Sequence, residues 1–273
     1  MNLLFTIDHG YVGILSKCLR SIRRFPAQGG YDVYLIHPDL EEVDMEHIRE
    51  DISPAAPHSE VWEEMRLHSI RVEASAFDFF PENFRYPKTM YYRIFAADLL
   101  PDSLERILYL DPDIVVINPL TELYEMDLEG KYFLGCTHTK KMLTQFNRLR
   151  LDLPEEAHYI NTGVLMMNLA ALRQGQSKEE VVRYVEKYGK FFTLPDQDVI
   201  SALYGDRTGM LDTIRYNLSD RILTMYNADP RNTEKIDVDW LRKNGVIIHY
   251  CGRNKPWKEN YMGVLNVFYD EVE

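Results

Sequence analysis

The sequence contains little cysteine, and no arrangement of it that builds a site. Cys18, Cys136 and Cys251 are the three cysteines among 273 residues, and no CxxC pair occurs. An odd number of widely spaced cysteines favours neither a disulfide framework nor a zinc site, and it is typical of a reducing cytoplasm. We therefore expect all three to be buried free thiols.

Long apolar runs and an excess of positive charge are also absent. No stretch approaches the ~20 apolar residues that a membrane-spanning helix needs, and residues 1–8 have neither the basic start nor the long apolar core of a signal peptide. The 31 Lys and Arg residues are outnumbered by 43 Asp and Glu, so the formal net charge is −12. This balance argues against nucleic acid or anionic lipid as the main partner. The sequence predicts a soluble cytoplasmic protein, in which a small basic pocket for a phosphorylated molecule remains allowed.

Two common phosphate-binding loops are missing as well. No Gly-x-Gly-x-x-Gly follows the first apolar run, and no Gly-rich loop ends in Lys-Ser or Lys-Thr. The sequence therefore does not support a dinucleotide-binding or ATP-binding loop of either type.

The chain does contain a regular alternation of apolar strands and helices. Segments 3–7, 11–25 and 31–36 form a strand–helix–strand crossover, which predicts a parallel sheet. With 45% apolar and 27% charged residues and no repeat or linker, residues 1–273 are expected to form a single α/β domain. The basic segment 139–150 is predicted to be a mobile surface loop. Further strands are predicted at 69–74, 107–110, 114–117, 132–138, 163–169 and 246–249, and further helices at 41–67, 88–100, 178–188, 197–204 and 258–272.

One segment places two carboxylates between two buried strands. Apolar residues 107–110 lead into Asp111-Pro112-Asp113, and apolar residues 114–117 follow. Two like charges at the end of a buried strand, joined by a proline of fixed φ, favour a hard divalent cation bound through oxygen. The alternative is that Asp-Pro-Asp is only a turn, because both residue types favour turns.

A second segment, 246–257, adds a nitrogen ligand and positive charge. His249 ends an apolar strand, so a satisfied core histidine is the default interpretation. Gly252, however, lets the backbone approach a ligand closely, and Lys255 is a compact charge suited to phosphate. A neutral imidazole with two carboxylates forms a mixed site that suits Mn²⁺, and diphosphate oxygens can fill the remaining positions.

Three further polar groups lie at the ends of predicted elements. Asp8 follows the first strand, at the edge where open α/β sheets bind ligands, although capping of the next helix is the alternative. Asn161 and Gly163 open an apolar strand, where they either read ligand hydroxyls or form an ordinary turn. Asp196-Gln197-Asp198 begins a helix, and capping explains only the first of these three residues.

Together these segments resemble family 8 glycosyltransferases. The resemblance runs from the first strand to residue 257, and it is strongest to bacterial members related to lipopolysaccharide galactosyl- and glucosyltransferases, with glycogenin more distant. It implies a single-domain GT-A fold, Rossmann-like with a mixed and mostly parallel sheet flanked by helices. The segments that occur in the family's order are Asp8, Tyr91-Tyr92-Arg93, Asp111-Pro112-Asp113, Asn161-Thr162-Gly163, Asp196-Gln197-Asp198 and His249…Gly252…Lys255-Pro256-Trp257.

The resemblance also implies an activity and roles for individual residues. The protein would move glucose or galactose, with retention, from UDP-glucose or UDP-galactose to a saccharide acceptor of the cell envelope. Gln197 and Asp196 would be catalytic; because an amide is a poor nucleophile, front-side attack and a covalent intermediate both stay open. Mn²⁺, or Mg²⁺, would be bound by Asp111, Asp113 and His249, and the donor by Asp8 and Tyr11 at uracil, Gly252 and Lys255 at the diphosphate, Asp111 through the metal, and Arg93, Asn161, Asp196 and Gln197 at the sugar.

Two functions other than glycosyl transfer are compatible with part of this pattern. A sugar nucleotidyltransferase also uses paired aspartates and Mg²⁺, but it needs a Gly-rich, Arg-containing loop after its first strand, which residues 8–12 do not supply. A non-catalytic nucleotide-sugar-binding protein would lack one of the metal ligands, and all three are present. The chain departs from the family at Gly10, where several relatives carry Asn. The given sequence stops at Glu273, where relatives often continue into a basic, aromatic, membrane-touching tail; this tail is either missing or was cut away, so membrane association is unsupported.

Overall fold

The computed structural model describes residues 1–53, 65–81, 87–139 and 141–272. One strand of its main sheet, formed by residues 161–168, is antiparallel to both of its neighbours, whereas the other neighbouring pairs are parallel. The predicted α/β class with a mostly parallel sheet is therefore confirmed. In order across the sheet, the strands are β3 (Met65–Arg71), β2 (Tyr31–His37), β1 (Asn2–Thr6), β4 (Arg106–Leu110), β7 (Asn161–Asn168), β6 (Phe133–Cys136) and β8 (Thr208–Met210).

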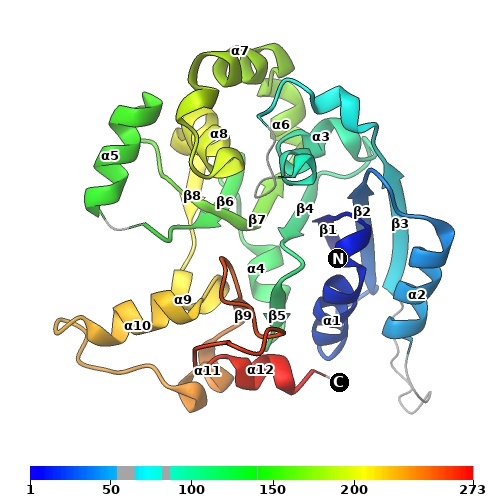
Figure 1. Ribbon diagram of the computed structural model, residues 1–273, viewed down its shortest axis with the longest axis vertical. Coiled ribbons are helices and arrows are strands. Elements are labelled where there is room, and N and C mark those ends of the chain that lie inside the picture. Colours follow the sequence, from blue (N-terminus) through cyan, green and yellow to red (C-terminus); the bar gives the residue numbers. More distant parts are fainter. Residues whose placement is uncertain (54–64, 82–86, 140, 273) are drawn as a thin grey trace.

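The sheet separates two apolar cores, because successive side chains of a strand point to opposite faces. In β1, Leu3 belongs to one core and Leu4 to the other, and in β4 Leu108 and Tyr109 divide in the same way. The first core lies under α1 (Val12–Arg23) and α2 (Glu42–Ile52). The second lies under the 3-10 helix η3 (Lys88–Phe95), α3 (Ala96–Leu99), α6 (Leu169–Gly175), α7 (Lys178–Tyr188) and α8 (Pro195–Tyr204), which gather at the top of Figure 1.

A small second sheet carries part of the later site. It pairs β5 (Ile114–Val116) with β9 (Ile247–His249) in antiparallel fashion. Val115 and Ile248 pack in a third apolar cluster with residues of α10 (Asp220–Ala228), α11 (Val238–Asn244) and α12 (Asn266–Asp270), in the lower part of Figure 1. The other elements are α4 (Thr121–Glu125), α5 (Lys141–Leu151), α9 (Thr213–Tyr216), η1 (His9–Tyr11), η2 (Ala74–Phe77), η4 (Gly189–Phe191) and η5 (Gly205–Arg207).

The third strand begins earlier than the sequence predicts. β3 covers Met65–Arg71 instead of 69–74, because it pairs with β2 along its whole length, ending with His37 opposite Arg71. Pairing with a buried neighbour therefore decides its register, and the weak alternation of its own side chains does not. The first half of the predicted helix 41–67 is α2. Residues 54–64, which hold most of its second half, lie outside the described part of the chain.

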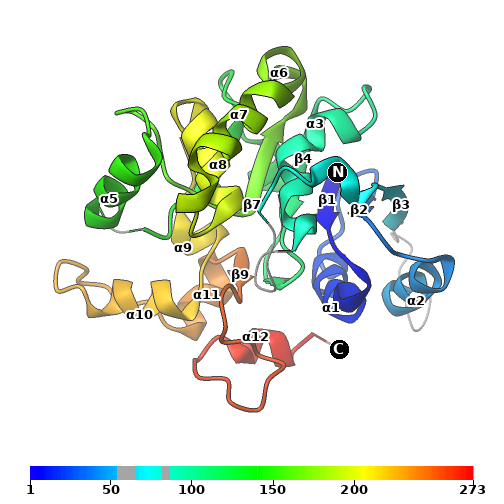
Figure 2. The ribbon, with the colours of Figure 1, turned by 45° about the horizontal axis from the view of Figure 1, so that its top comes forward.

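Residues 139–150 were predicted to be a mobile loop, and this was wrong. Residues 141–151 form α5, which stands with α10 at the edge of the molecule opposite α2 in both views (Figure 1, Figure 2). Arg150 ties this helix to the body of the protein: it donates to the two carboxylate oxygens of the buried Asp198 at 2.9 and 2.8 Å. A long-range ion pair of this kind leaves no signal in the local sequence.

Two predicted helices differ in extent or type. The closing helix covers Asn266–Asp270 rather than 258–272, because Asp220 accepts hydrogen bonds from the N–H groups of Val264 and Leu265 at 2.9 and 3.3 Å and holds the preceding segment as a loop. The predicted helix 88–100 begins as the 3-10 helix η3 and becomes α-helical only in α3.

Two expectations from composition can be compared with the structure. Cys18 and Cys136 are buried free thiols as predicted, whereas Cys251 is only partly buried because it lines a cavity. Of the helices in the described ranges, none is both long enough and apolar enough to cross a membrane.

Candidate active site

Polar residues from four strands meet at one edge of the main sheet. Asp111 follows β4 directly, and its N–H donates to the carbonyl of Gly163 at 2.8 Å. Because β7 is antiparallel to β4, the first residues of β7 lie beside the last residues of β4. Asp113 precedes β5, in which Ile114 pairs with His249 at the end of β9. The topology thus brings the three predicted metal ligands together.

Asp111, Asp113 and His249 form a compact cluster. One ligand atom from each lies within 4.8 Å of the others. His249 Nε2 is 3.5 Å from Asp111 Oδ2 and 3.2 Å from Asp113 Oδ1. This nitrogen is buried and has no hydrogen-bond partner among the described residues. A buried polar atom without a partner needs an explanation, and a cation shared by the three side chains supplies one.

Gly163 keeps the space beside this cluster open. A Cβ at this position would overlap the ring of His249 and come within 2.7 Å of Asp111 Oδ2. Two carboxylates and one imidazole offer the oxygen and nitrogen donors that suit Mn²⁺, and in part Mg²⁺. The residues present therefore fit a divalent cation. A simple Asp-Pro-Asp turn would not account for the position of His249.

The opposite charges in and around the cluster stabilise the ionised forms of its side chains. Burial raises the pKa of Asp111, but Arg93 and His249 outweigh it and hold that pKa below its usual value. Burial also opposes ionisation of Asp113, whose pKa is nevertheless lowered by His249 and Lys255. Burial lowers the pKa of His249, whereas Asp113 above all raises it, to about 10. Both carboxylates are therefore ionised and available as ligands. Without a cation the imidazole of His249 carries the balancing proton, and a divalent cation at the same place would displace that proton.

Arg93, on η3, links the cluster to Asp196 at the start of α8. Its Nη1 lies 3.0 Å from Asp111 Oδ1 and 3.2 Å from Asp196 Oδ2, and it donates to the carbonyl of Thr162 at 3.0 Å. The hydroxyl of Thr162 donates to Asp196 Oδ2 at 2.5 Å. The guanidinium also lies 4.4 Å from the centre of the Tyr109 ring. One buried cation thereby holds two carboxylates in fixed positions.

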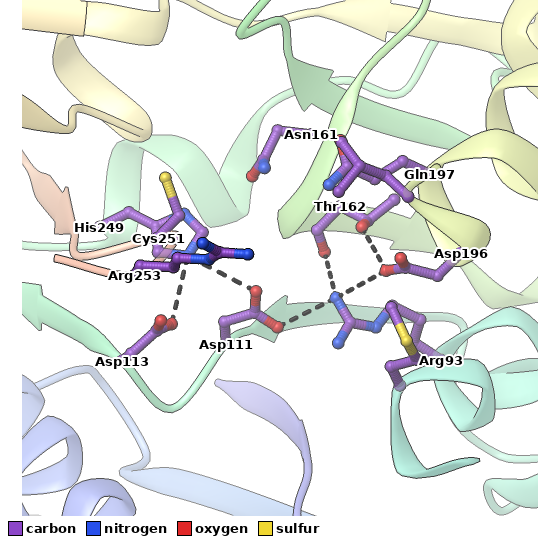
Figure 3. Close-up of a pocket in the computed structure, with 13 residues that line it drawn as sticks. Arg93, Asp111, Asp113, Asn161, Thr162, Asp196, Gln197, His249, Cys251 and Arg253 are labelled. Carbon is purple, nitrogen blue, oxygen red and sulfur yellow. Dashed lines mark hydrogen bonds and ion pairs between the residues drawn. The ribbon is translucent and has the colours of Figure 1, made fainter. Parts of the chain in front are cut away.

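A cavity of about 580 Å³ lies over this network (Figure 3). Its size is typical of small-molecule sites. Figure 3 shows Asp113 and His249 on one side and Arg93 and Asp196 on the other, with Asp111 between them. Eight predicted site residues line the cavity, namely Arg93, Asp111, Asp113, Asn161, Asp196, Gln197, His249 and Gly252, together with Met90, Thr162, Leu194, Cys251 and Arg253.

Comparison with known proteins identifies the family. A sequence model described as "Glycosyl transferase family 8" matches residues 2–261. The chain belongs to this family. It is therefore a glycosyltransferase, as predicted. It is 24% identical to the lipopolysaccharide 1,2-glucosyltransferase of Escherichia coli K12 over 261 residues, which cover 94% of this chain and 72% of that protein. It is 25% identical to general stress protein A of Bacillus subtilis 168 over 198 residues, which cover 71% of this chain and 68% of that protein.

The fold of this glycosyltransferase is also found among solved structures. The galactosyltransferase LgtC, in complex with donor and acceptor sugar analogs, matches with a TM-score of 0.80 at 22% sequence identity. The match covers 100% of this chain and 95% of that one. This likeness confirms the predicted GT-A fold.

Lys255 of the glycosyltransferase lies against the cluster of Asp111, Asp113 and His249 but does not line the cavity. Its Nζ contacts Asp113 Oδ2 and donates to the carbonyl of Tyr250 at 2.8 Å. Burial lowers the pKa of Lys255, but Asp113, together with Tyr11 and Cys251, raises it above its usual value, so the ammonium stays charged. Gly252, which does line the cavity, has a φ of +88°, a conformation that favours glycine. Lys255 thus lies on the Asp113 side of the site, and Gly252 belongs to the cavity lining.

Asp8 and Tyr11 lie outside the cavity lining. Asp8 precedes η1 and makes no side-chain capping hydrogen bond among the described residues, although the backbone N–H of Gly10 in η1 acts to lower its pKa. Burial and Asp39 raise the pKa of Asp8. Burial raises the pKa of Tyr11, and the charge of Lys255 lowers it, which places the phenol within electrostatic range of Lys255. Their contact with uracil stays a prediction.

The sequence analysis missed three residues of this glycosyltransferase's site. The hydroxyl of Tyr109 donates to Asp111 Oδ1 at 2.7 Å; the two residues are two apart at a strand end, so strand periodicity could have indicated this contact. Thr162 stands between two predicted residues of β7 and could have been included with them. Asn217 carries no local signal, and only the tertiary fold brings it to His249.

Proposed function

We propose that this glycosyltransferase moves glucose or galactose from a UDP-hexose to a saccharide acceptor, with retention of configuration and with Mn²⁺ as the cofactor. The observation that carries the proposal is the cluster of Asp111, Asp113 and His249, whose unbonded Nε2 faces two ionised carboxylates beside the cavity. A cell-envelope saccharide is proposed as acceptor because the similar Escherichia coli protein is named for transfer to lipopolysaccharide.

The leaving diphosphate would be met by positive charge from two sources. Asp111, Asp113 and His249 would hold the divalent cation, which supplies positive charge where the diphosphate departs. Lys255 supplies the second charge, and the carbonyl of Tyr250 already holds its ammonium beside Asp113. Charges fixed in advance at the place where negative charge develops stabilise the transition state more than any other single effect.

The hexose would occupy the Asn161 and Asp196 side of the cavity. Asn161 Oδ1 accepts hydrogen bonds from the N–H of Gly163 at 3.1 Å and from Asn217 Nδ2 at 2.9 Å. Its NH₂ group is therefore left to donate to a hexose hydroxyl. Gln197 lines the same cavity next to Asp196, where its amide can contact the ring near the reacting carbon.

We propose front-side attack for the transfer itself. Gln197 is an amide and a poor nucleophile, and the carboxylate of Asp196 is engaged by Arg93 and Thr162. The acceptor hydroxyl oxygen forms a bond to the anomeric carbon while the bond from that carbon to the UDP oxygen breaks. A phosphate oxygen of UDP takes the hydroxyl proton. Configuration is retained because the acceptor arrives on the face from which UDP leaves.

Product analysis by NMR tests the donor and the stereochemistry. The protein is incubated with Mn²⁺, dilute methanol as a small acceptor, and UDP-glucose or UDP-galactose; the metal is then chelated before spectra are recorded. We expect slow consumption of one of the two donors, giving UDP and the methyl α-hexoside, and only background consumption without Mn²⁺. The β-hexoside would overturn retention. Consumption of neither donor would overturn the proposed hexose donors, and formation of UTP and hexose 1-phosphate with added pyrophosphate would indicate a nucleotidyltransferase.

A further inference from the structure

Asn217 connects the metal cluster to the sugar side of the cavity. It is 0% exposed and lies just beyond α9. Its Oδ1 is 2.8 Å from His249 Nδ1, and its Nδ2 is 2.9 Å from Asn161 Oδ1. No residue of the cavity lining makes both of these contacts, and Asn217 itself is not part of that lining. It can therefore act on the site only through these two neighbours.

The direction of each hydrogen bond follows from one backbone group. The N–H of Gly163 can only donate, and it lies 3.1 Å from Asn161 Oδ1, so that atom is an acceptor. The group of Asn217 that faces the same oxygen must then be its NH₂. Its carbonyl oxygen is consequently turned to His249, and an oxygen acceptor there requires the proton on Nδ1. In the neutral ring that a bound cation requires, His249 Nε2 then carries the lone pair, on the side of Asp111 and Asp113.

The backbone around Asn217 is held firmly enough to impose this arrangement. Its N–H donates to the carbonyl of Thr213 at 3.1 Å, and its own carbonyl accepts from His138 Nε2 at 2.8 Å. The next residue, Leu218, forms a bridge beside β9, with the N–H of His249 donating to its carbonyl at 2.7 Å. Asn217 and His249 are thus neighbours in a hydrogen-bonded ladder, and their relative position does not depend on a bound ligand.

We propose that Asn217 is a positioning residue that fixes the tautomer of His249 for metal binding and, with the same amide group, orients the NH₂ of Asn161 toward the hexose. A ligating histidine that donates its other nitrogen to a fixed oxygen gains orientation and basicity, and loss of such an outer partner typically weakens metal binding. The inference deepens the proposed function and rests on it for the role of Asn161, whereas the effect on His249 can be measured without any sugar.

Two substitutions separate the two halves of this role. Asn217→Ala removes both contacts, so we expect Mn²⁺ binding, measured by calorimetry on the metal alone, to weaken about 10- to 100-fold. Asn217→Asp keeps one oxygen that accepts from Nδ1–H of His249. Its second oxygen replaces the NH₂ group and faces Asn161 Oδ1, where two acceptors repel each other. We expect its Mn²⁺ affinity to stay within about threefold of the unmodified protein, while the KM for UDP-hexose rises about tenfold or more.

Asn227→Ala is the matched control. Asn227 also makes a pair of side-chain hydrogen bonds, to the carbonyl and N–H of Ile236 at 2.7 and 2.9 Å, but neither residue lines the cavity. Its replacement tests whether losing a structural asparagine alone changes metal binding, and we expect an unchanged Kd for Mn²⁺. Equal weakening by Asn217→Ala and Asn217→Asp, or no weakening by Asn217→Ala, would overturn the positioning role.

The unmodified protein offers a test that needs no variant. In protein labelled with ¹⁵N-histidine and saturated with Mg²⁺, NMR should show a proton on Nδ1 of His249 that exchanges slowly with solvent, and none on Nε2. A proton on Nε2 would overturn the inference even if both variants failed to fold. Failure of the proposed function looks different: no UDP-hexose would be turned over, while the Mn²⁺ affinities and the tautomer would still follow the expected pattern.

Discussion

Asp113→Ala is expected to lower Mn²⁺-dependent turnover of the UDP-hexose about 1000-fold or more, equivalent to about 4 kcal/mol of transition-state stabilisation. One oxygen of Asp113 lies 3.2 Å from His249 Nε2, and the other contacts Lys255. Removing the carboxylate therefore takes away a metal ligand and the counter-charge of the ammonium. Initial-rate kinetics with varied Mn²⁺ measure the effect. The Kd for Mn²⁺ should rise by more than the about 10- to 100-fold that loss of an outer partner costs.

Two companion variants make this result specific. Asp113→Asn keeps the shape of the side chain and should be nearly as inactive, because an amide carries no negative charge for the cation or for Lys255. Asp102→Ala removes a fully exposed carboxylate whose partner, Arg173, is 3.7 Å away, and should change neither rate nor metal affinity. Full activity of Asp113→Ala would mean that Asp111-Pro112-Asp113 is a structural turn after all.

Arg93→Met is expected to lower the free energy of unfolding by about 3–5 kcal/mol, the cost of leaving buried charges without a partner. Arg93 is 7% exposed, and its Nη1 contacts Asp111, Asp196 and the carbonyl of Thr162 together. Methionine fills much of the same volume but offers no donor. Urea unfolding followed by circular dichroism measures the change.

The loss in free energy of unfolding caused by Arg93→Met should depend on pH. Burial raises the pKa of Asp196, and Arg93 is the strongest influence that lowers it. Without Arg93 the folded protein holds a proton on Asp196 that the unfolded chain releases, so stability is lost as the pH rises through the folded pKa. We expect a larger deficit near pH 8 than near pH 5. The same deficit at both values would contradict this account of Asp196.

Arg215→Met is the control for the loss of an arginine. Arg215 also pairs with a carboxylate, donating to both oxygens of Glu122 at 2.9 Å, but both side chains are substantially exposed. Exposed pairs of this kind contribute at most about 1 kcal/mol. A similar loss of stability in both variants would show that burial of the Arg93 network has no special effect.

The cluster of Asp111, Asp113 and His249 could be predicted from sequence because each of its members has a local signal. Asp111, Asp113 and His249 adjoin apolar runs that read as buried strands, and a charged or polar residue at such a strand end is unusual. The parallel unit that begins the chain could be predicted for the same reason. The position of Asn161 was harder to predict, because β7 brings this residue to the site only by running antiparallel to β4.

Other features depend on contacts between distant segments and left no local pattern. Asn217 reaches His249 through the bridge between Leu218 and Ile248. The helix α5 is tied to the body of the protein by the pair between Arg150 and Asp198, 48 residues apart. Sequence periodicity indicates which face of a single segment is buried, but it does not predict polar contacts between distant segments of the fold.

We propose that Asp111, Asp113 and His249 hold a cation that binds the diphosphate next to Lys255. Calorimetric titration of UDP into the metal-free protein, with and without added Mn²⁺, measures this directly. We expect tight binding of UDP with Mn²⁺ present, and binding weakened about 100-fold or more without it, because the diphosphate would then face two carboxylates with Lys255 as its main counter-charge. Equal affinity in both titrations, or no binding in either, would contradict the proposal.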